Sequence, residues 1–337
     1  MLFRSLGDEF AVAAVWDIDE ALAAAVAQSC GARACADLAD LLADDRVEVV
    51  AICSPANCHA EQAIAAMRAG KRMVLIEKPL ANTAEEARRI GKAARESGTT
   101  VLVGAMHLFD PGWQAVRCEA IRIAVDAPLI RSGIVLPYNS RYEPWAFEAR
   151  PKVESEGQAP PASPTPSAQE RALQVLGGGI LQLAIHDLPL VRAMLRNPAE
   201  LTVTAAETFA PFGYALTVCA GEQIIDLFTH VGDHWQARWT LEAEGARESV
   251  SIAFPPSFIA AGAARATLVR DGTATIQPQL SGNGYAGEWG AMARVMRGSS
   301  AVAVGIPHID ALVADLAFAA DILEQSKALV RARSAAA

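Results

Sequence analysis

The alternation of hydrophobic and polar positions divides the chain into two parts of different texture. Between residues 10 and 104, short apolar runs alternate with amphipathic stretches of helical period, the pattern of a parallel sheet with crossover helices. The predicted strands cover residues 10–16, 47–53, 72–76 and 100–104, and the predicted helices cover 19–29, 58–69 and a stretch capped near Asn82 or Thr83. The amino-terminal part is therefore predicted to be a doubly wound α/β domain.

The remainder of the chain is rich in extended segments. After a helix around residues 111–123, strands are predicted at 128–136, 201–208, 214–229, 235–243, 248–254 and 265–277, followed by helices at about 285–297 and 309–327. Strands with little helix between them pair antiparallel, so an α+β domain is expected at 125–337 after an α/β domain at 1–124. Five prolines among small polar residues predict a flexible loop at 151–169.

Composition narrows the class of protein. A chain of 337 residues that is 52% hydrophobic and 20% charged can build two cores and is not disordered over most of its length. Its formal net charge of −9 and the absence of a basic patch argue against nucleic acid and membrane surfaces as partners. We find no apolar run long enough to span a membrane and no secretory signal. The six cysteines follow no tight spacing, so we expect reduced thiols in a cytoplasmic protein.

The tripeptide Glu77-Lys78-Pro79 follows a predicted buried strand directly. It therefore emerges at a carboxyl end of the sheet, the edge where doubly wound sheets bind ligands. A lysine at this place can polarise a substrate hydroxyl and contact a nicotinamide. Taken alone, the tripeptide is equally an ordinary strand-to-loop sequence, so its context matters.

Three further segments supply that context. Ile52–His59 precedes the tripeptide, Ala69-Gly70-Lys71 leads into its strand, and Gly177–Asp187 follows about 100 residues later. In this order they resemble the glucose–fructose oxidoreductase / inositol dehydrogenase / MocA family of nicotinamide-dependent dehydrogenases. The resemblance implies a Rossmann domain followed by an α+β domain with an open, mostly antiparallel sheet. It also implies a substrate bound between the two and a homodimer or homotetramer formed through that sheet.

The resemblance carries roles to individual residues. It implies that Lys78 and His186 are catalytic, with Gln182 standing where the family has a catalytic Asp. The residues that it places on the cofactor are Asp17, Ser54, Pro55, Ala56, His59, Glu77, Lys78 and Met106. It further suggests a cis peptide bond between Lys78 and Pro79, and no metal site is expected.

Two of these residues have a simpler alternative. Asp17 ends a predicted strand, where a carboxylate can accept both ribose hydroxyls and repel a 2′-phosphate, but an Asp there can also cap the helix that starts near Asp19. His186 has a side chain that titrates near neutrality and suits a general base, yet it can also be a core histidine on an apolar helix. His230 and His234 are spaced like metal ligands on a helix, but Gly232-Asp233 between them predicts a turn.

The sequence departs from the family pattern at four places. Ala56 replaces an Asn, Leu108 replaces an Arg, and Gln182 replaces the Asp. The fourth departure is the phosphate-binding glycine motif, which should lie about 20 residues before Asp17, where only Gly7 is found. We expect a misplaced start codon or a truncated gene, with an in-frame upstream extension that encodes the missing strand and glycines; a natural loss of cofactor binding is the alternative.

The function favoured by these observations is hydride transfer between a nicotinamide cofactor and a secondary alcohol or ketone of a sugar, cyclitol or related polyol. NAD is expected rather than NADP because of Asp17. The alternative is a non-catalytic ligand sensor or scaffold of the same fold, which Gln182 and the missing glycines favour and which Lys78 and His186 oppose.

Overall fold

The computed structural model describes residues 9–141, 166–256, 262–278 and 280–336, which form two compact units. The first unit contains Met1–Phe109 and Gly284–Ala317, and the second contains Asp110–Asn283 and Phe318–Ala337. The predicted boundary after residue 124 differs from this division in two ways. Helix α5 (Pro111–Asp126) belongs to the second unit, and residues 284–317 return to the first.

The first unit has the predicted Rossmann-type parallel sheet, in two pieces. Strands β3, β4 and β5 form one parallel sheet, and β1 and β2 form another. The strands are β1 (Ala14–Val15), β2 (Arg33–Ala34), β3 (Val49–Ile52), β4 (Met73–Glu77) and β5 (Thr100–Gly104). The helices are α1 (Glu20–Cys30), α2 (Leu38–Leu42), α3 (Ala56–Arg68) and α4 (Ala84–Ser97).

The prediction of a strand over residues 10–16 is wrong in length, since only two residues of it are paired. Within the described residues, β1 pairs only with β2, and β3 pairs only with β4.

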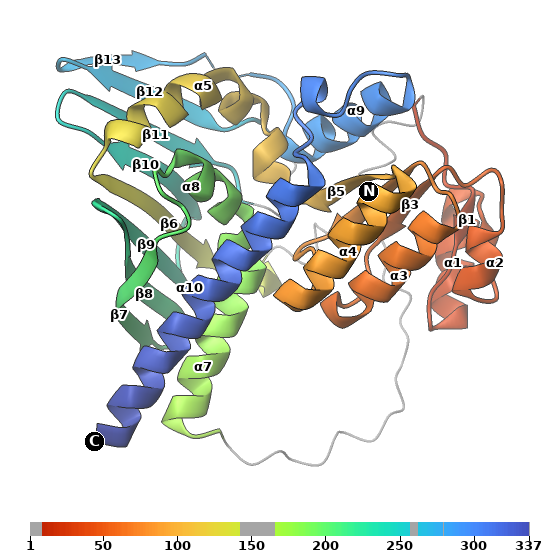
Figure 1. Cartoon of the computed structure of the whole chain (residues 1–337), viewed down its shortest axis with the longest axis horizontal. Helices are drawn as coiled ribbons and strands as arrows, with labels where there is room; N and C mark the ends of the chain where they lie inside the picture. The colour runs from red at the N-terminus through yellow and green to blue at the C-terminus, as the bar shows by residue number, and fades with distance from the viewer. Residues whose placement is uncertain (1–8, 142–165, 257–261, 279, 337) are drawn as a thin grey trace. The chain divides into compact units, whose positions relative to one another are not determined.

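Helices cover both faces of the three-stranded sheet. Met73, Leu75 and Leu102 pack against α9 (Gly284–Met296), while α3 packs on β3 and β4 from the other side, next to α4 (Figure 1). The expected cap of α4 is present: Thr83 and Glu86 form a reciprocal capping box. The segment after residue 283 thus completes the first unit's second helical layer, which explains the shifted boundary.

The second unit contains one eight-stranded sheet in the order β13-β12-β11-β10-β6-β9-β8-β7. All neighbours are antiparallel except β6 and β9, so the predicted open, mostly antiparallel sheet is confirmed. The strands are β6 (Leu129–Pro137), β7 (Leu201–Phe209), β8 (Phe212–Ala220), β9 (Gln223–Gly232), β10 (Arg238–Glu244), β11 (Glu248–Phe254), β12 (Arg265–Arg270) and β13 (Thr273–Ile276).

Two segments, each predicted as a single strand, form hairpins of two strands in the structure. The segment 214–229 is split by a turn at Gly221, whose φ is +60°, and 265–277 is split at Asp271-Gly272, with φ values of +47° and +78°. These left-handed conformations reverse the chain in a two-residue turn, as an Asp-Gly pair favours.

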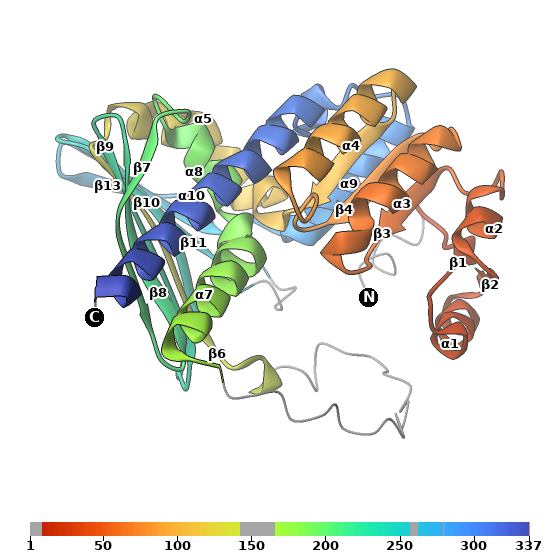
Figure 2. The ribbon, with the colours of Figure 1, turned by 60° about the horizontal axis from the view of Figure 1, so that its bottom comes forward.

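The helices of the second unit lie on one face of this sheet, which Figure 2 shows nearly edge-on. They are α5, α7 (Ala168–Gly178), α8 (Leu188–Met194) and the carboxyl-terminal part of α10 (Ile309–Ala336). Of the predicted loop 151–169, residues 151–165 lie outside the described residues, and the last residues begin α7 instead. Within the described residues, no single helix is both long and apolar enough to cross a membrane; 168–186 and 188–194, bent by 66°, meet the criteria of length and composition only as a pair.

Candidate functional site

Lys78 lies where β4 ends, at the carboxyl edge of the three-stranded parallel sheet. Its side chain is half-buried, and the Lys78–Pro79 peptide is cis, as predicted. Burial lowers the pKa of the Lys78 ammonium, and the neighbouring Glu77 carboxylate opposes that effect. The structure thus places a cation beside an anion at the edge where this class of sheet binds ligands.

His59 braces the turn that carries Lys78. Its ring is 1% exposed, with Nδ1 2.8 Å from the backbone oxygen of Pro79 and Nε2 2.8 Å from that of Ser54. A neutral imidazole donates to one of these oxygens and an imidazolium donates to both. Both nitrogens are therefore engaged by the protein backbone, which gives His59 a structural role, while its contact with a cofactor stays a prediction.

The other predicted cofactor residues of this unit follow the carboxyl ends of strands β3 and β5. Ser54 follows β3 and donates its hydroxyl to Gln62 Oε1 at 2.6 Å, Pro55 precedes the first turn of α3, and Ala56 is the first residue of that helix. Met106 begins a short 3₁₀ helix, η2 (Met106–Phe109), and is 4% exposed. Ser54 and Ala56 stand between the end of a parallel strand and a helix amino terminus, where partial positive charge favours anionic groups.

Asp17 follows β1 and has a local hydrogen bond. Its Oδ1 accepts from the backbone N–H of Asp19 at 2.9 Å, while Asp19 itself caps α1 by accepting from the N–H groups of Ala21 and Leu22 at 3.0 Å. The capping role considered for Asp17 thus belongs to Asp19. Asp17 keeps a carboxylate at the amino end of the first helix.

His186 belongs to the second unit and lies in an irregular segment. The chain passes from α7 into a π-helical turn at Gly179–Leu183 and then into a 3₁₀ turn at Ala184–His186. A regular helix, which the core alternative for His186 assumes, is therefore wrong for this segment, and α-helical spacing does not place Gln182 beside His186.

Asp187 holds this segment against the sheet. It is fully buried, and its Oδ2 accepts from Ser132 Oγ at 2.7 Å and from Trp239 Nε1 at 2.5 Å. The His186 ring packs edge-to-face on Trp239, with ring centroids 5.6 Å apart. His186 is 4% exposed, which the core alternative predicts, but its irregular backbone and neighbouring buried carboxylate are typical of a functional site.

Sequence reasoning missed two residues on the carboxyl side of the Rossmann-type sheet. Glu288 and Tyr285 lie on α9, and both interact electrostatically with Glu77. The spacing Gly284-x-x-Gly287-Glu288, small residues next to an acid on one helical face, is the signal that could have found them.

Other candidate groups have structural explanations. His230 lies in β9 and His234 follows that strand, so the two histidines are not on a helix; His230 Nδ1 and His234 Nε2 are 2.6 Å apart. The described residues contain no cluster of three or more metal-ligating side chains. All six cysteines are free.

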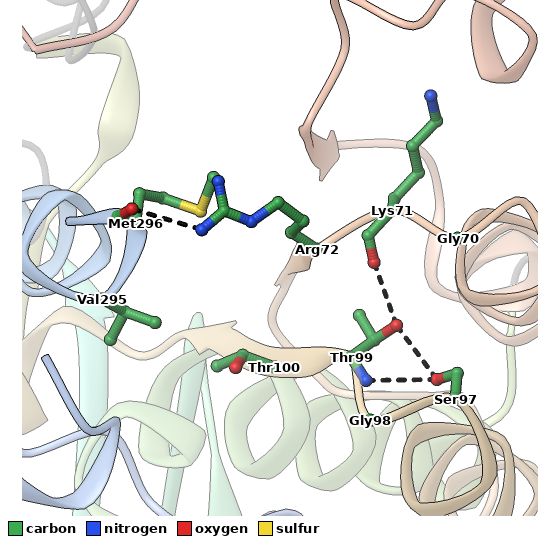
Figure 3. A pocket seen from close by; sticks show the side chains of 9 residues that line it. All are labelled: Gly70, Lys71, Arg72, Ser97, Gly98, Thr99, Thr100, Val295 and Met296. Carbon is green, nitrogen blue, oxygen red and sulfur yellow. Dashed lines mark hydrogen bonds between the residues drawn. The ribbon is translucent and has the colours of Figure 1, made fainter. Parts of the chain in front are cut away.

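A polar pocket lies at the opposite, amino-terminal edge of the Rossmann-type sheet (Figure 3). Its lining includes Lys71, Arg72, Ser97 and Thr99. Figure 3 shows Lys71 leading away from Thr99; its Nζ donates to the Asp44 backbone oxygen at 2.9 Å. Arg72 pairs with Glu48, and Thr99 donates to the Lys71 backbone oxygen. The polar side chains of the lining thus have partners within the protein, so the pocket is not the candidate site.

The described residues fit the nicotinamide and ribose parts of a nicotinamide dinucleotide better than they fit its pyrophosphate. Lys78, Glu77 and Ser54 offer polar groups at strand carboxyl ends, and Asp17 offers a ribose acceptor. No glycine-rich turn at a helix amino terminus is found in residues 9–141 to hold a pyrophosphate.

Comparisons with known proteins agree with the fold and the motifs. The family model described as "Oxidoreductase family, NAD-binding Rossmann fold" matches residues 3–105. Inositol 2-dehydrogenase of Rubrobacter xylanophilus is 39% identical over 121 residues, 36% of this chain and 35% of that protein. The matches to the first curated relatives cover only about a third of those proteins' length.

Solved structures resemble almost the whole fold. UDP-N-acetylglucosamine 3-dehydrogenase from Acidithiobacillus ferrooxidans superposes with a TM-score of 0.69 at 18% identity, covering 95% of this chain and 91% of that one. A 3-ketoreductase from Actinomadura kijaniata, determined with NADP, has a TM-score of 0.64 at 18% identity and covers 94% and 89%. The sequence match over residues 3–105 agrees with the predicted resemblance to the Gfo/Idh/MocA oxidoreductases and with an NAD-binding Rossmann fold there, and the solved structures show that the fold of the whole chain is shared with such proteins.

Proposed function

We propose that this chain is an oxidoreductase that moves hydride between a nicotinamide cofactor and a secondary alcohol or ketone of a sugar, cyclitol or related polyol. The observation that carries the proposal is Lys78, held by a buried brace beside Glu77 at the carboxyl edge of a parallel sheet. The names of an inositol 2-dehydrogenase, a UDP-N-acetylglucosamine 3-dehydrogenase and a 1,5-anhydro-D-fructose reductase among the similar proteins support the substrate class.

The proposed chemistry assigns one task to each side chain. Hydride leaves a carbinol carbon only as its hydroxyl proton is removed. The Lys78 ammonium stabilises the developing alkoxide, and His186 takes the proton. When bound, the cofactor supplies the hydride acceptor.

NAD is the cofactor that we propose in preference to NADP. The Asp17 carboxylate follows β1, with Asp19 and Glu20 directly behind it, and this concentration of negative charge would repel a 2′-phosphate. One similar structure was determined with NADP, so the preference has to be measured.

We further propose that the chain forms a homodimer or homotetramer through the face of the eight-stranded sheet that carries no helices. Alternation along β9 leaves Ile224 and Phe228 43% and 40% exposed on that face. Sedimentation of the wild type as a dimer or tetramer, and of Phe228→Glu as a monomer, would support this assembly. A monomeric wild type would exclude it.

The experiment for the enzymatic proposal combines binding and turnover. NAD and NADP are titrated into the full chain by calorimetry, and reduction of the nicotinamide is followed with a panel of polyols and sugars. We expect Lys78→Met to reduce kcat/KM at least about a hundredfold. Lys92→Met, an exposed lysine of the same unit, should leave it unchanged.

The outcomes separate the rival functions. Cofactor binding with no turnover on any substrate would favour the ligand-sensing alternative, and turnover that survives Lys78→Met would remove the proposed role of that lysine. Absence of NAD and NADP binding would reject the proposal for this chain.

A further inference from the structure

Two acids, Glu77 and Glu288, interact electrostatically at the edge of the first unit where β4 ends and α9 begins. Side chains alternate along a strand, so Glu77 points to the same side as Met73 and Leu75, which pack against α9. On α9, Ala291 and Met292 pack against the same cluster, and Glu288 lies one helical turn earlier on that face. The two carboxyl groups therefore lie at the same end of one helix–sheet interface.

Three glycines make room for this pair. A Cβ at Gly284 or Gly287 would lie 2.2 or 2.1 Å from a backbone oxygen of η2, so this face of α9 is in direct contact with that segment. A Cβ at Gly104, the partner of Glu77 across β4 and β5, would lie 3.1 Å from Glu77 Oε2. The carboxyl of Glu77 thus lies against the backbone at Gly104, and α9, which approaches η2 closely, carries a buried Glu288.

The two acids differ in their surroundings. Glu288 is 3% exposed, and its Oε2 has no hydrogen-bond partner within the described residues. Burial raises the pKa of Glu288 well above its ordinary value, and the charge of Glu77 adds to the effect. Burial also raises the pKa of Glu77, but the Lys78 charge, the Lys78 backbone N–H and His59 counteract it. If one proton is shared, it therefore resides on Glu288.

Two further titratable groups near the pair, Cys53 and Tyr285, have raised pKa values. Desolvation, then Glu77 and Glu288, raise the pKa of the Cys53 thiol to about 11, although the residue as a whole is exposed. Burial and the same two acids raise the pKa of the Tyr285 phenol. His107 lies in η2, the segment that α9 contacts, and is 1% exposed.

We propose that Glu288 is a positioning residue: it keeps its proton, so that Glu77 alone carries the negative charge that holds the Lys78 ammonium at the end of β4. Glu288 fills the space behind Glu77 with a neutral acid, which excludes water without competing for the lysine. The inference rests on the proposed role of Lys78, and its test does not depend on turnover.

The test measures the titration of Lys78 directly. The chain has five lysines, so ¹³C-labelled lysine in the full chain gives few NMR signals, and Lys78→Met assigns the one of interest. Exposed Lys92 serves as the internal reference. Three variants are compared with the wild type: Glu77→Gln, Glu288→Gln and Glu288→Ala.

The expected shifts differ in sign. Glu77→Gln removes the anion and moves the titration of Lys78 to lower pH, whereas Glu288→Gln replaces one neutral group by another and leaves it unmoved. Glu288→Ala opens space for water, which relieves the desolvation of Lys78 and moves its titration to higher pH. A downward shift in Glu288→Gln as large as that in Glu77→Gln would show that Glu288 is ionised and would overturn the proposal.

Infrared spectroscopy supplies an independent readout. The carbonyl band of a protonated carboxylic acid at neutral pH should be present in the wild type and lost in Glu288→Gln. Other buried acids, such as Asp110 and Asp187, cancel in the difference between the two spectra. A band that persists in Glu288→Gln and disappears in Glu77→Gln would place the proton on the wrong acid. If turnover survives Lys78→Met while these results hold, the proposed function fails and the proton assignment stands.

Discussion

Replacement of His59 by alanine removes the brace of the Lys78 turn. The ring is 1% exposed, and its nitrogens lie 2.8 Å from the backbone oxygens of Ser54 and Pro79. A buried acceptor left unpaired costs about 1–3 kcal/mol, and the cavity left by the ring adds to that loss. We therefore expect the free energy of unfolding of the first unit to fall by about 3 kcal/mol, which corresponds to a decrease in Tm of about 10 °C for a unit of this size.

Urea denaturation and calorimetry of the full chain measure this loss, with the transition of the first unit analysed separately. The control is His308→Ala, in the same unit, where the side chain is 65% exposed; its loss should stay below about 1 kcal/mol. Equal losses in the two variants would refute the reasoning, because the brace would then contribute no more than a surface histidine.

Three further predictions concern the cofactor, the base and acid stability. Asp17→Ala should weaken NAD binding about tenfold and spare NADP, as measured by calorimetry; equal losses would contradict the ribose role. His186→Ala should abolish turnover and remove the limb of the pH–rate profile assigned to His186, since it removes the proposed general base; turnover that survives with an unchanged profile would contradict the assignment. Hydrogen bonds from Arg122 and Arg270 lower the pKa of Glu248 from 4.5 to about 2. Its contribution to stability is therefore complete above pH 4.5 and lost as the pH falls toward 2, so the Tm difference between the wild type and Glu248→Gln should be largest near neutral pH and vanish near pH 2.

The parts of the site that follow local rules were predictable from the sequence. A buried strand that runs straight into Glu77-Lys78 can only deliver them at its carboxyl end. Thr83 with Glu86 three residues later is a capping box in sequence as in structure. These features depend only on residues a few positions apart, so the order of residues in the sequence is enough to predict them.

The parts that depend on distant contacts were not predictable in the same way. Glu288 is 211 positions after Glu77, and only the return of α9 to the first sheet brings them together. The π and 3₁₀ turns before His186 replace a regular helix because Asp187 is drawn to Ser132 and Trp239, which lie on strands of the second unit. Periodicity along the chain does not report such anchoring.

Transfer of deuterium from substrate to cofactor tests the central claim most directly. A polyol carrying deuterium on its carbinol carbon is incubated with the full chain and NAD, and the reduced cofactor is isolated and weighed by mass spectrometry. We predict that the deuterium appears in the reduced nicotinamide, and that Lys78→Met and His186→Ala abolish the transfer. Reduced cofactor without the label, or no reduced cofactor with any polyol despite measurable NAD binding, would contradict the proposed hydride transfer.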